Sequence, residues 1–174
     1  MRKVIFLDID GVLQPIGKQT RFKHDMDKLK IQLAEQYQDE EFLNMDKYDV
    51  GAVYYDWDKP AVERLRNLIK TVDAQIVISS DWRRSNPFPK INYLFKIHDL
   101  DSFITGQTPI SGKCRCEDIA QYLKLNNDIQ NFVILDDCYR SEFEEKYPQQ
   151  FVHCTRNFDD ACYDKALAIL AKDT

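Results

Sequence analysis

Short apolar segments recur along the chain and predict β-strands. The clearest are residues 4–7, 74–78 and 131–135, which are of strand length and strongly apolar, and the first of them is apolar throughout. Continuous rather than alternating apolar positions are typical of strands that are buried on both faces. Two weaker segments, 102–105 and 150–153, predict further strands.

Segments with apolar residues at helical spacing separate these strands. Pro60 lies at a favourable first position of a helix, and the apolar stripe that follows it continues to Val72. Similar stripes predict helices at 91–97, 116–125 and 158–172. The alternation of strands and helices predicts an α/β fold in three layers, a parallel sheet with helices on both faces.

Residues 14–58 interrupt this alternation. The segment is rich in charged residues, and its apolar positions between His24 and Leu43 have a diluted helical spacing. We interpret it as a small helical flap or cap, inserted after the first strand of a single domain that covers residues 1–174. Residues 53–55 are expected to form a short extended piece that leads back to the sheet.

Composition and charge narrow the class of protein. The 174 residues are 44% hydrophobic and 30% charged, which is typical of a globular domain. Their net charge of −5 disfavours duplex nucleic acid as a partner. The first apolar run ends at Asp8, too early for a signal peptide or a membrane helix. Five irregularly spaced cysteines suit reduced thiols, so we expect a cytoplasmic protein without a membrane partner.

Carboxyl and hydroxyl side chains follow each of the three clearest strands. In chain order they are Asp8, Asp10, Ser79, Ser80, Asp136 and Asp137. The carboxyl ends of parallel strands meet at one edge of a sheet, where ligands gather. Four carboxylates in one crevice repel one another unless a cation lies among them, and oxygen ligands favour a hard ion. The pattern therefore predicts a Mg2+ site.

The same strand ends carry a family resemblance. Residues 6–13 resemble the first motif of the haloacid dehalogenase-like (HAD) superfamily of phosphohydrolases, in which apolar residues precede D-x-D-G. Residues 76–79 resemble the second motif, an apolar strand that ends in Ser or Thr. Lys113 matches the third-motif lysine, and residues 136–137 match the acidic pair of the fourth motif.

Two further segments resemble a small bacterial branch of HAD domains. Residues 79–83 are similar to its S-S-x-W-R element, and residues 115–119 are similar to its R-G-x-E-I segment. Cys116 stands in place of the usual glycine, so both Lys113 and Arg115 are candidates for the third-motif cation, of which Lys113 has the better spacing. Trp82 is interpreted as a packing residue.

The resemblance implies a Mg2+-dependent phosphatase with an aspartyl-phosphate intermediate. The expected catalytic residues are Asp8 as the nucleophile, Asp10 as the general acid and base, Ser79 and Lys113. The expected metal ligands are Asp8, Asp10 through its carbonyl oxygen, Asp136 and Asp137. The expected substrate-binding residues are Ser80, Arg83 and Arg115.

The expected substrate is a phosphomonoester on a small molecule, a nucleotide or a phosphoprotein. A small polar flap would leave the crevice partly open, which suits a bulky substrate such as a nucleic-acid end. Dehalogenases of the superfamily lack an acid at the position of Asp10, so phosphoryl transfer is preferred.

Three other functions use similar residues. A phosphotransferase has the same motifs, and a non-catalytic or regulatory binding module would keep the fold and the metal site. A receiver domain places its acidic pair after the first strand. The late position of Asp136 and Asp137 disagrees with that order.

Other motifs do not fit the chain. Residues 106–113 have five residues between their glycines where a P-loop has four. A cysteine phosphatase loop would need an arginine at position 160, which is Asp160. Zinc would require the fold to gather cysteines that lack a C-x-x-C pair. These cysteines are Cys114, Cys116, Cys138 and Cys154.

Overall fold

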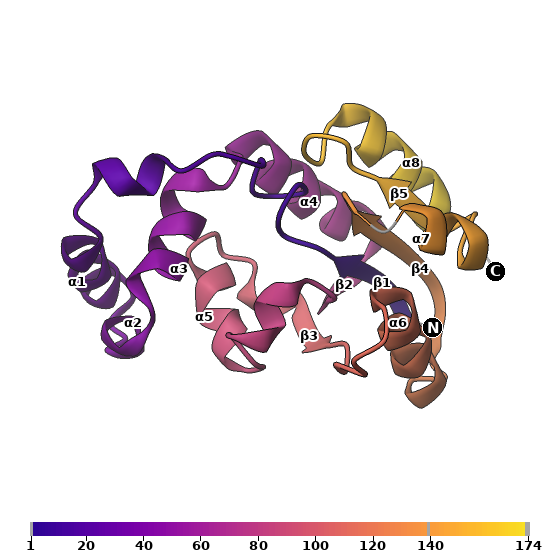
Figure 1. Cartoon of the computed structure of the whole chain (residues 1–174), viewed down its shortest axis with the longest axis horizontal. Coiled ribbons are helices and arrows are strands. Elements are labelled where there is room, and N and C mark those ends of the chain that lie inside the picture. Colours follow the sequence, from indigo (N-terminus) through magenta and orange to yellow (C-terminus); the bar gives the residue numbers. More distant parts are fainter. Residues whose placement is uncertain (1, 139, 173–174) are drawn as a thin grey trace.

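A five-stranded parallel sheet forms the centre of the fold (Figure 1), as the computed structural model of residues 2–138 and 140–172 shows. The strand order is β3-β2-β1-β4-β5, and neighbouring strands pair in parallel. The strands are β1 (Arg2–Leu7), β2 (Ala74–Ile78), β3 (Ile104–Gln107), β4 (Ile129–Asp136) and β5 (Phe151–His153).

Helices cover both faces of the sheet. The side chains of Ile5 and Leu7 pack with α4 (Lys59–Val72) and α8 (Asp160–Leu170). The alternate side chains of β1, Val4 and Phe6, pack with α6 (Arg115–Leu125) and α7 (Arg140–Lys146). This arrangement confirms the predicted three-layer α/β fold, since every apolar residue of β1 has a partner on one face or the other.

The predicted helices lie close to their expected positions. Helix α4 begins where predicted because the Asp58 carboxylate accepts a hydrogen bond from the backbone N–H of Ala61. Helix α5 (Lys90–Lys96), α6 and α8 differ from the prediction by one or two residues at most ends. The sequence analysis did not predict α7, whose seven residues carry five charges and one buried phenylalanine.

Two local predictions are wrong. Residues 53–55 are not extended but belong to the π-helical turn η2 (Ala52–Asp56), which directs the Asp56 carboxylate inward. Residues 102 and 103 belong to the 3₁₀ turn η4 (Asp101–Phe103), closed by a hydrogen bond from Phe103 N to the Leu100 carbonyl. The strand begins only at residue 104, where pairing with β2 begins.

Residues 14–58 form a mainly helical segment between β1 and α4. Figure 1 shows α1 (Met26–Tyr37) and α2 (Glu41–Asn44) at one end of the molecule, with α3 (Lys47–Gly51) nearer to α5. Apolar residues of this segment, such as Leu33 and Phe42, are fully buried in the same core as the sheet. The segment is therefore packed onto the domain and does not form a separate unit.

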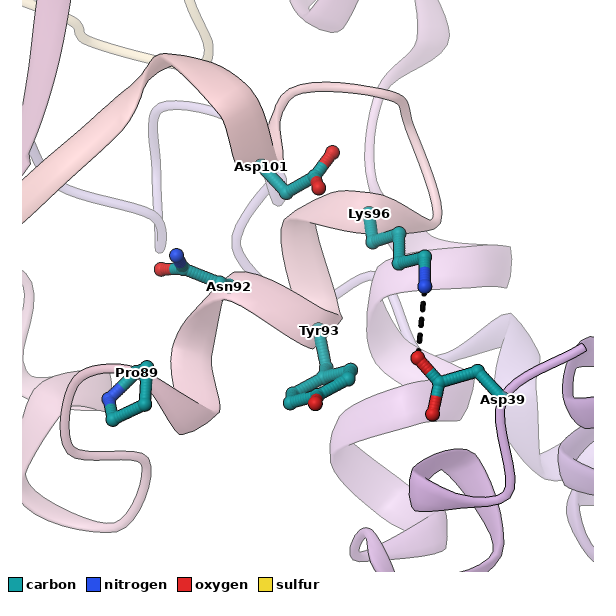
Figure 2. A pocket seen from close by; sticks show the side chains of 6 residues that line it. All are labelled: Asp39, Pro89, Asn92, Tyr93, Lys96 and Asp101. Carbon is teal, nitrogen blue, oxygen red and sulfur yellow. Dashed lines mark hydrogen bonds and ion pairs between the residues drawn. The ribbon is translucent and has the colours of Figure 1, made fainter. Parts of the chain in front are cut away.

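A cavity of about 290 Å³ lies between this segment and α5. Figure 2 shows Lys96 on its wall, with Nζ 2.8 Å from Oδ2 of Asp39. No motif residue lines this cavity, and the ion pair of Lys96 with Asp39 joins the helical segment to α5. Within residues 2–138 and 140–172, no helix is long and apolar enough to cross a membrane.

Candidate active site

The carboxyl ends of β1, β2 and β4 bring the predicted site residues together. The backbone N–H of Asp8 bonds the Leu135 carbonyl at 3.0 Å, and the N–H of Ser79 bonds the Leu7 carbonyl at 3.0 Å. These ladder bonds hold the residues that follow the three strands at one level. Asp8, Ser79 and Asp136 are all buried there.

Arg115 lies between the two buried carboxylates. Its Nη1 is 2.8 Å from Oδ2 of Asp8 and also contacts Oδ2 of Asp136. Its Nη2 is 3.4 Å from Oδ2 of Asp81. Arg115 is the first residue of α6, so its side chain reaches the crevice from a helix N-terminus.

Burial dominates the electrostatics of this cluster. It raises the pKa of Asp8 above its ordinary value, against the lowering effect of Arg115. Burial and then the charge of Asp8 raise the pKa of Asp136 to about 7. Burial lowers the pKa of Arg115, but the two carboxylates outweigh it and raise that pKa. One cation shared by two buried anions leaves a net negative charge that a further cation would neutralise.

Asp10 is partly buried at the edge of the crevice and hydrogen-bonded to a tryptophan. The indole Nε1–H of Trp82 donates to Oδ2 of Asp10 at 2.9 Å. Burial raises the pKa of Asp10, the bond from Trp82 opposes this, and the charge of Asp137 adds to it. A raised pKa favours the protonated form of a carboxyl group, which is the form that donates a proton.

The chain after β4 lies directly against the turn after β1. A Cβ on Gly11 would lie 2.2 Å from Cγ of Asp137, and Gly11 has a φ of +73°. Only glycine combines this backbone conformation with such a close approach. Ligand atoms of Asp136, Asp137 and Cys138 lie within 4.8 Å of one another. Together with Asp8, the two aspartates offer the all-oxygen donor set that Mg2+ prefers, so the residues fit that ion.

The two serines after β2 have different partners. Ser79 Oγ is buried and has no hydrogen-bond partner among the described residues. The Ser80 side chain hydrogen-bonds the Asp8 carboxylate, and its Oγ also accepts a bond from Trp82 N at 3.4 Å. Ser79 therefore has an unused donor at the strand end, whereas Ser80 orients Asp8.

Arg83 is buried and points away from solvent. Its side chain is 1% exposed, and Nη1 donates to the carbonyl oxygens of Ser79 and Ser80 at 2.5 and 2.7 Å. Its Nη2 is 2.6 Å from Oδ2 of Asp118, which is also buried. These contacts fasten the loop after β2 to α6.

Lys113, by contrast, is exposed. Its backbone N–H bonds Ser111 Oγ at 3.3 Å, and its side chain lines a polar cavity of about 130 Å³ together with Arg84 and Arg115. Of the two candidate third-motif cations, the structure brings Arg115 to the carboxylates and leaves Lys113 at the rim.

Three contributions to this site were missed in the sequence analysis. Trp82 was assigned to packing, although a tryptophan beside an acidic strand end can also donate a hydrogen bond. The partnership of Arg83 with Asp118 depends on a contact across 35 positions, which no local pattern signals. Gly11 was noted for its conformational freedom, but the contact with Asp137 was not foreseen.

Comparison with known proteins agrees with the fold. A family model described as the HAD domain in Swiss Army Knife RNA repair proteins matches residues 4–158. No curated protein and no solved structure gives a significant match to the chain.

Proposed function

The chain belongs to the family of HAD domains in Swiss Army Knife RNA repair proteins, and from that premise we propose that it is a phosphatase acting on phosphomonoesters. The observation that carries the proposal is the buried pair Asp8 and Asp136, which shares the guanidinium of Arg115 at the carboxyl end of the sheet. A carboxylate that can act as the nucleophile, a cation that can bind phosphoryl oxygens and carboxylates that can bind a metal ion therefore lie together at this end of the sheet.

Asp8 is the nucleophile in this proposal. An oxygen of its carboxylate attacks phosphorus in line, the new O–P bond forms, and the bond from phosphorus to the leaving oxygen breaks. A water molecule then attacks the phosphorus of the aspartyl phosphate and releases both Asp8 and inorganic phosphate. Two displacements of this kind replace one more difficult hydrolysis.

Asp10 moves the protons in both steps. It protonates the leaving oxygen in the first step and accepts a proton from the attacking water in the second. Its raised pKa and its bond to Trp82 support this role. Well-positioned acid–base groups contribute roughly 10²–10⁴-fold to such reactions.

Arg115 and Ser79 bind the non-reacting phosphoryl oxygens. Arg115 already contacts Asp8, so its guanidinium lies where charge accumulates during the attack. The unpartnered Ser79 Oγ supplies a further donor. Lys113, at the rim, is placed to meet a more distant part of the substrate. Mg2+, held by Asp8, the Asp10 carbonyl, Asp136 and Asp137, would neutralise repulsion between Asp8 and the phosphate dianion.

The substrate class that the family description supports is a phosphate at an RNA end. The net charge of −5 and the cations at the rim of the site fit a terminal phosphate better than a long duplex. The second candidate, transfer of the phosphoryl group to an acceptor other than water, uses the same residues.

The test is hydrolysis by the purified full chain, with an aryl phosphate and with oligoribonucleotides that carry a 3′- or a 5′-phosphate. We expect turnover that requires Mg2+ and that is lost in a chelator and in Asp8→Asn. Asp164→Asn, the same chemical change on the exposed face of α8, is the matched control and should keep full activity. Turnover by Asp8→Asn at the wild-type rate, or no turnover of any of the three substrates, would contradict the proposal.

A further inference from the structure

A second cluster of metal-ligating side chains lies beside the candidate active site. Sγ of Cys114 and Sγ of Cys116 are 2.7 Å apart. These two sulfur atoms and a carboxylate oxygen of Glu117 all lie within 4.8 Å of one another. We propose that this cluster binds Zn2+, independently of the proposed phosphatase activity.

The start of α6 holds the two thiols together. Cys114 is the N-cap residue, with extended backbone angles, and Cys116 is in the first helical turn. At this junction of extended and helical backbone the two side chains lie on the same side, whereas in a regular helix positions two apart lie on different faces. Cys116 is buried and Cys114 is partly exposed, so an ion can enter from the Cys114 side.

A further carboxylate lines the cavity beside this cluster and comes from α7. Cys114, Cys116 and Glu117 line a cavity of about 420 Å³ together with Glu142 and two further residues of α7, Glu145 and Lys146. Oε2 of Glu142 is buried and has no hydrogen-bond partner among the described residues. A buried carboxylate oxygen without a partner is costly, and a bound cation would satisfy it.

The donor types select zinc over magnesium. Two thiols with carboxylates form a sulfur–oxygen set, which suits Zn2+ and is not a set that Mg2+ uses. A tetrahedral ion with Zn–S bonds of ~2.3 Å holds its sulfur atoms about 3.8 Å apart. The thiols, now 2.7 Å apart, need to separate by only about 1 Å, a small side-chain rotation.

The charges around the cluster also favour a cation. Three glutamates line the cavity, at 117, 142 and 145, against the single lysine at 146. Lys146 Nζ is 2.5 Å from Oε1 of Glu117, which fixes that carboxylate and leaves Oε2 for a ligand bond. The thiols lose their protons on binding, and a divalent ion then neutralises two of the three negative charges of the thiolates and Glu142.

The cluster contains two of the four cysteines that were considered as zinc ligands from the sequence. Cys138 lies beside Asp136 and Asp137 in a different group. Cys154 is buried after β5, where its Sγ bonds the Val152 carbonyl at 3.8 Å. The fold therefore does not gather the four cysteines in one place, and carboxylates take the remaining positions.

The site has a structural consequence for Arg115, which stands between the two cysteines in the chain. Its side chain extends to Asp8 while the flanking thiols converge on each other. An ion held by residues 114 and 116 would fix the backbone from which the Arg115 guanidinium projects.

The test is a Co2+ titration of the full chain, reduced with a phosphine so that no thiol competes. Co2+ reports tetrahedral thiolate ligation by its sulfur-to-metal charge-transfer absorption, and this readout does not depend on turnover. We expect the absorption in the wild type, its displacement by Zn2+, and its loss in Cys114→Ser and in Cys116→Ser. Glu142→Gln should weaken binding without abolishing the absorption.

Cys138→Ser is the matched control and should keep the absorption. A second measurement covers variants that fold poorly: in the wild type, Zn2+ should protect Cys114 and Cys116 from alkylation while Cys138 reacts. The proposal is overturned if the wild type shows no thiolate absorption, if both single serine variants at 114 and 116 retain it, or if only Cys138→Ser removes it. Phosphatase activity of these variants does not test metal binding at this site, which the absorption and the alkylation report directly.

Discussion

The indole N–H of Trp82 donates a hydrogen bond of 2.9 Å to Oδ2 of Asp10. The bond fixes the orientation of the carboxyl group that we propose to be the general acid. The ring of Trp82 in turn packs at 6.4 Å, edge to face, against Trp57, which is itself buried. An aromatic pair, of which Trp57 is buried and Trp82 partly buried, therefore supports a proton donor at the edge of the crevice.

Removal of this hydrogen bond should impair proton donation more than binding. Trp82→Phe keeps most of the ring and loses the N–H, so we expect kcat on an alkyl phosphate to fall about tenfold or more. With p-nitrophenyl phosphate, whose leaving group needs little protonation, the fall should be small. The measurement is kcat and KM on both substrates.

Trp57→Phe is the matched control. The Nε1 of Trp57 is buried without a hydrogen-bond partner among the described residues, so this change removes no such bond. It should lower stability without any dependence on the leaving group. Equal losses on the two substrates in Trp82→Phe would show that Trp82 only packs.

Because Arg115 contacts both buried carboxylates, we propose it rather than Lys113 as the phosphoryl-binding cation. We expect Arg115→Met to lower kcat by about 10²–10³-fold, as the loss of one oxyanion donor does elsewhere. Arg115→Lys should restore little, because an ammonium group cannot bond two carboxylates with the geometry of a guanidinium. Lys113→Met, measured in parallel on the aryl phosphate, should cost far less. A larger loss for Lys113→Met than for Arg115→Met would reverse the assignment.

Alanine substitutions at Gly11 and Gly17 can distinguish backbone strain from a steric clash with Asp137. Gly11 and Gly17 both have a positive φ, but a Cβ on Gly17 meets nothing within 4 Å, whereas one on Gly11 meets Asp137. Both alanine variants should lose roughly 1–2 kcal/mol of stability from the left-handed conformation. Only Gly11→Ala should also lose activity and require more Mg2+. Similar activity in the two variants would argue against Asp137 as a metal ligand.

His98 should make the stability of the fold depend on pH. Its ring stacks on Trp57, its Nε2 is 2.9 Å from the Val53 carbonyl, and burial lowers its pKa from the ordinary value of 6.5. The unfolded chain therefore binds a proton at a higher pH than the native protein does. Stability from this residue is present above pH 6.5 and is lost as the pH falls from 6.5 through the lower, native pKa.

Urea unfolding between about pH 5 and pH 8 checks this sign. In the wild type the midpoint should fall on acidification, and in His98→Gln the dependence should be weaker. An equal slope in the two proteins would place the pH dependence on other groups.

The strands and helices around the site followed from the sequence because their signals are local. The apolar runs at 4–7 and 74–78, the second interrupted only by Gln75, have few alternatives to a buried strand, and β1 and β2 lie there. The prediction for residues 53–55 is wrong because aromatic and β-branched residues favour strands unless tertiary contacts decide otherwise. There the buried Asp56 decides: it accepts bonds from Thr20 Oγ1 and from the backbone N–H of Arg21.

The site residues were predictable in type but not in arrangement. Sequence order placed Asp8 and Asp136 at strand ends that must meet. It could not show which cation reaches them, because Lys113 and Arg115 are two positions apart and only the start of α6 directs one of them inward. Helix α7 was not predictable because it is short and mostly charged, and so it lacks an apolar stripe.

The central claim is that Asp8 accepts the phosphoryl group. The most direct measurement is mass spectrometry of the protein after an acid quench during turnover of an aryl phosphate with Mg2+. We expect one phosphoryl adduct on the peptide that contains Asp8, and neither adduct nor turnover in Asp8→Asn. Turnover of the wild type without any adduct, accompanied by turnover in Asp8→Asn, would contradict the account.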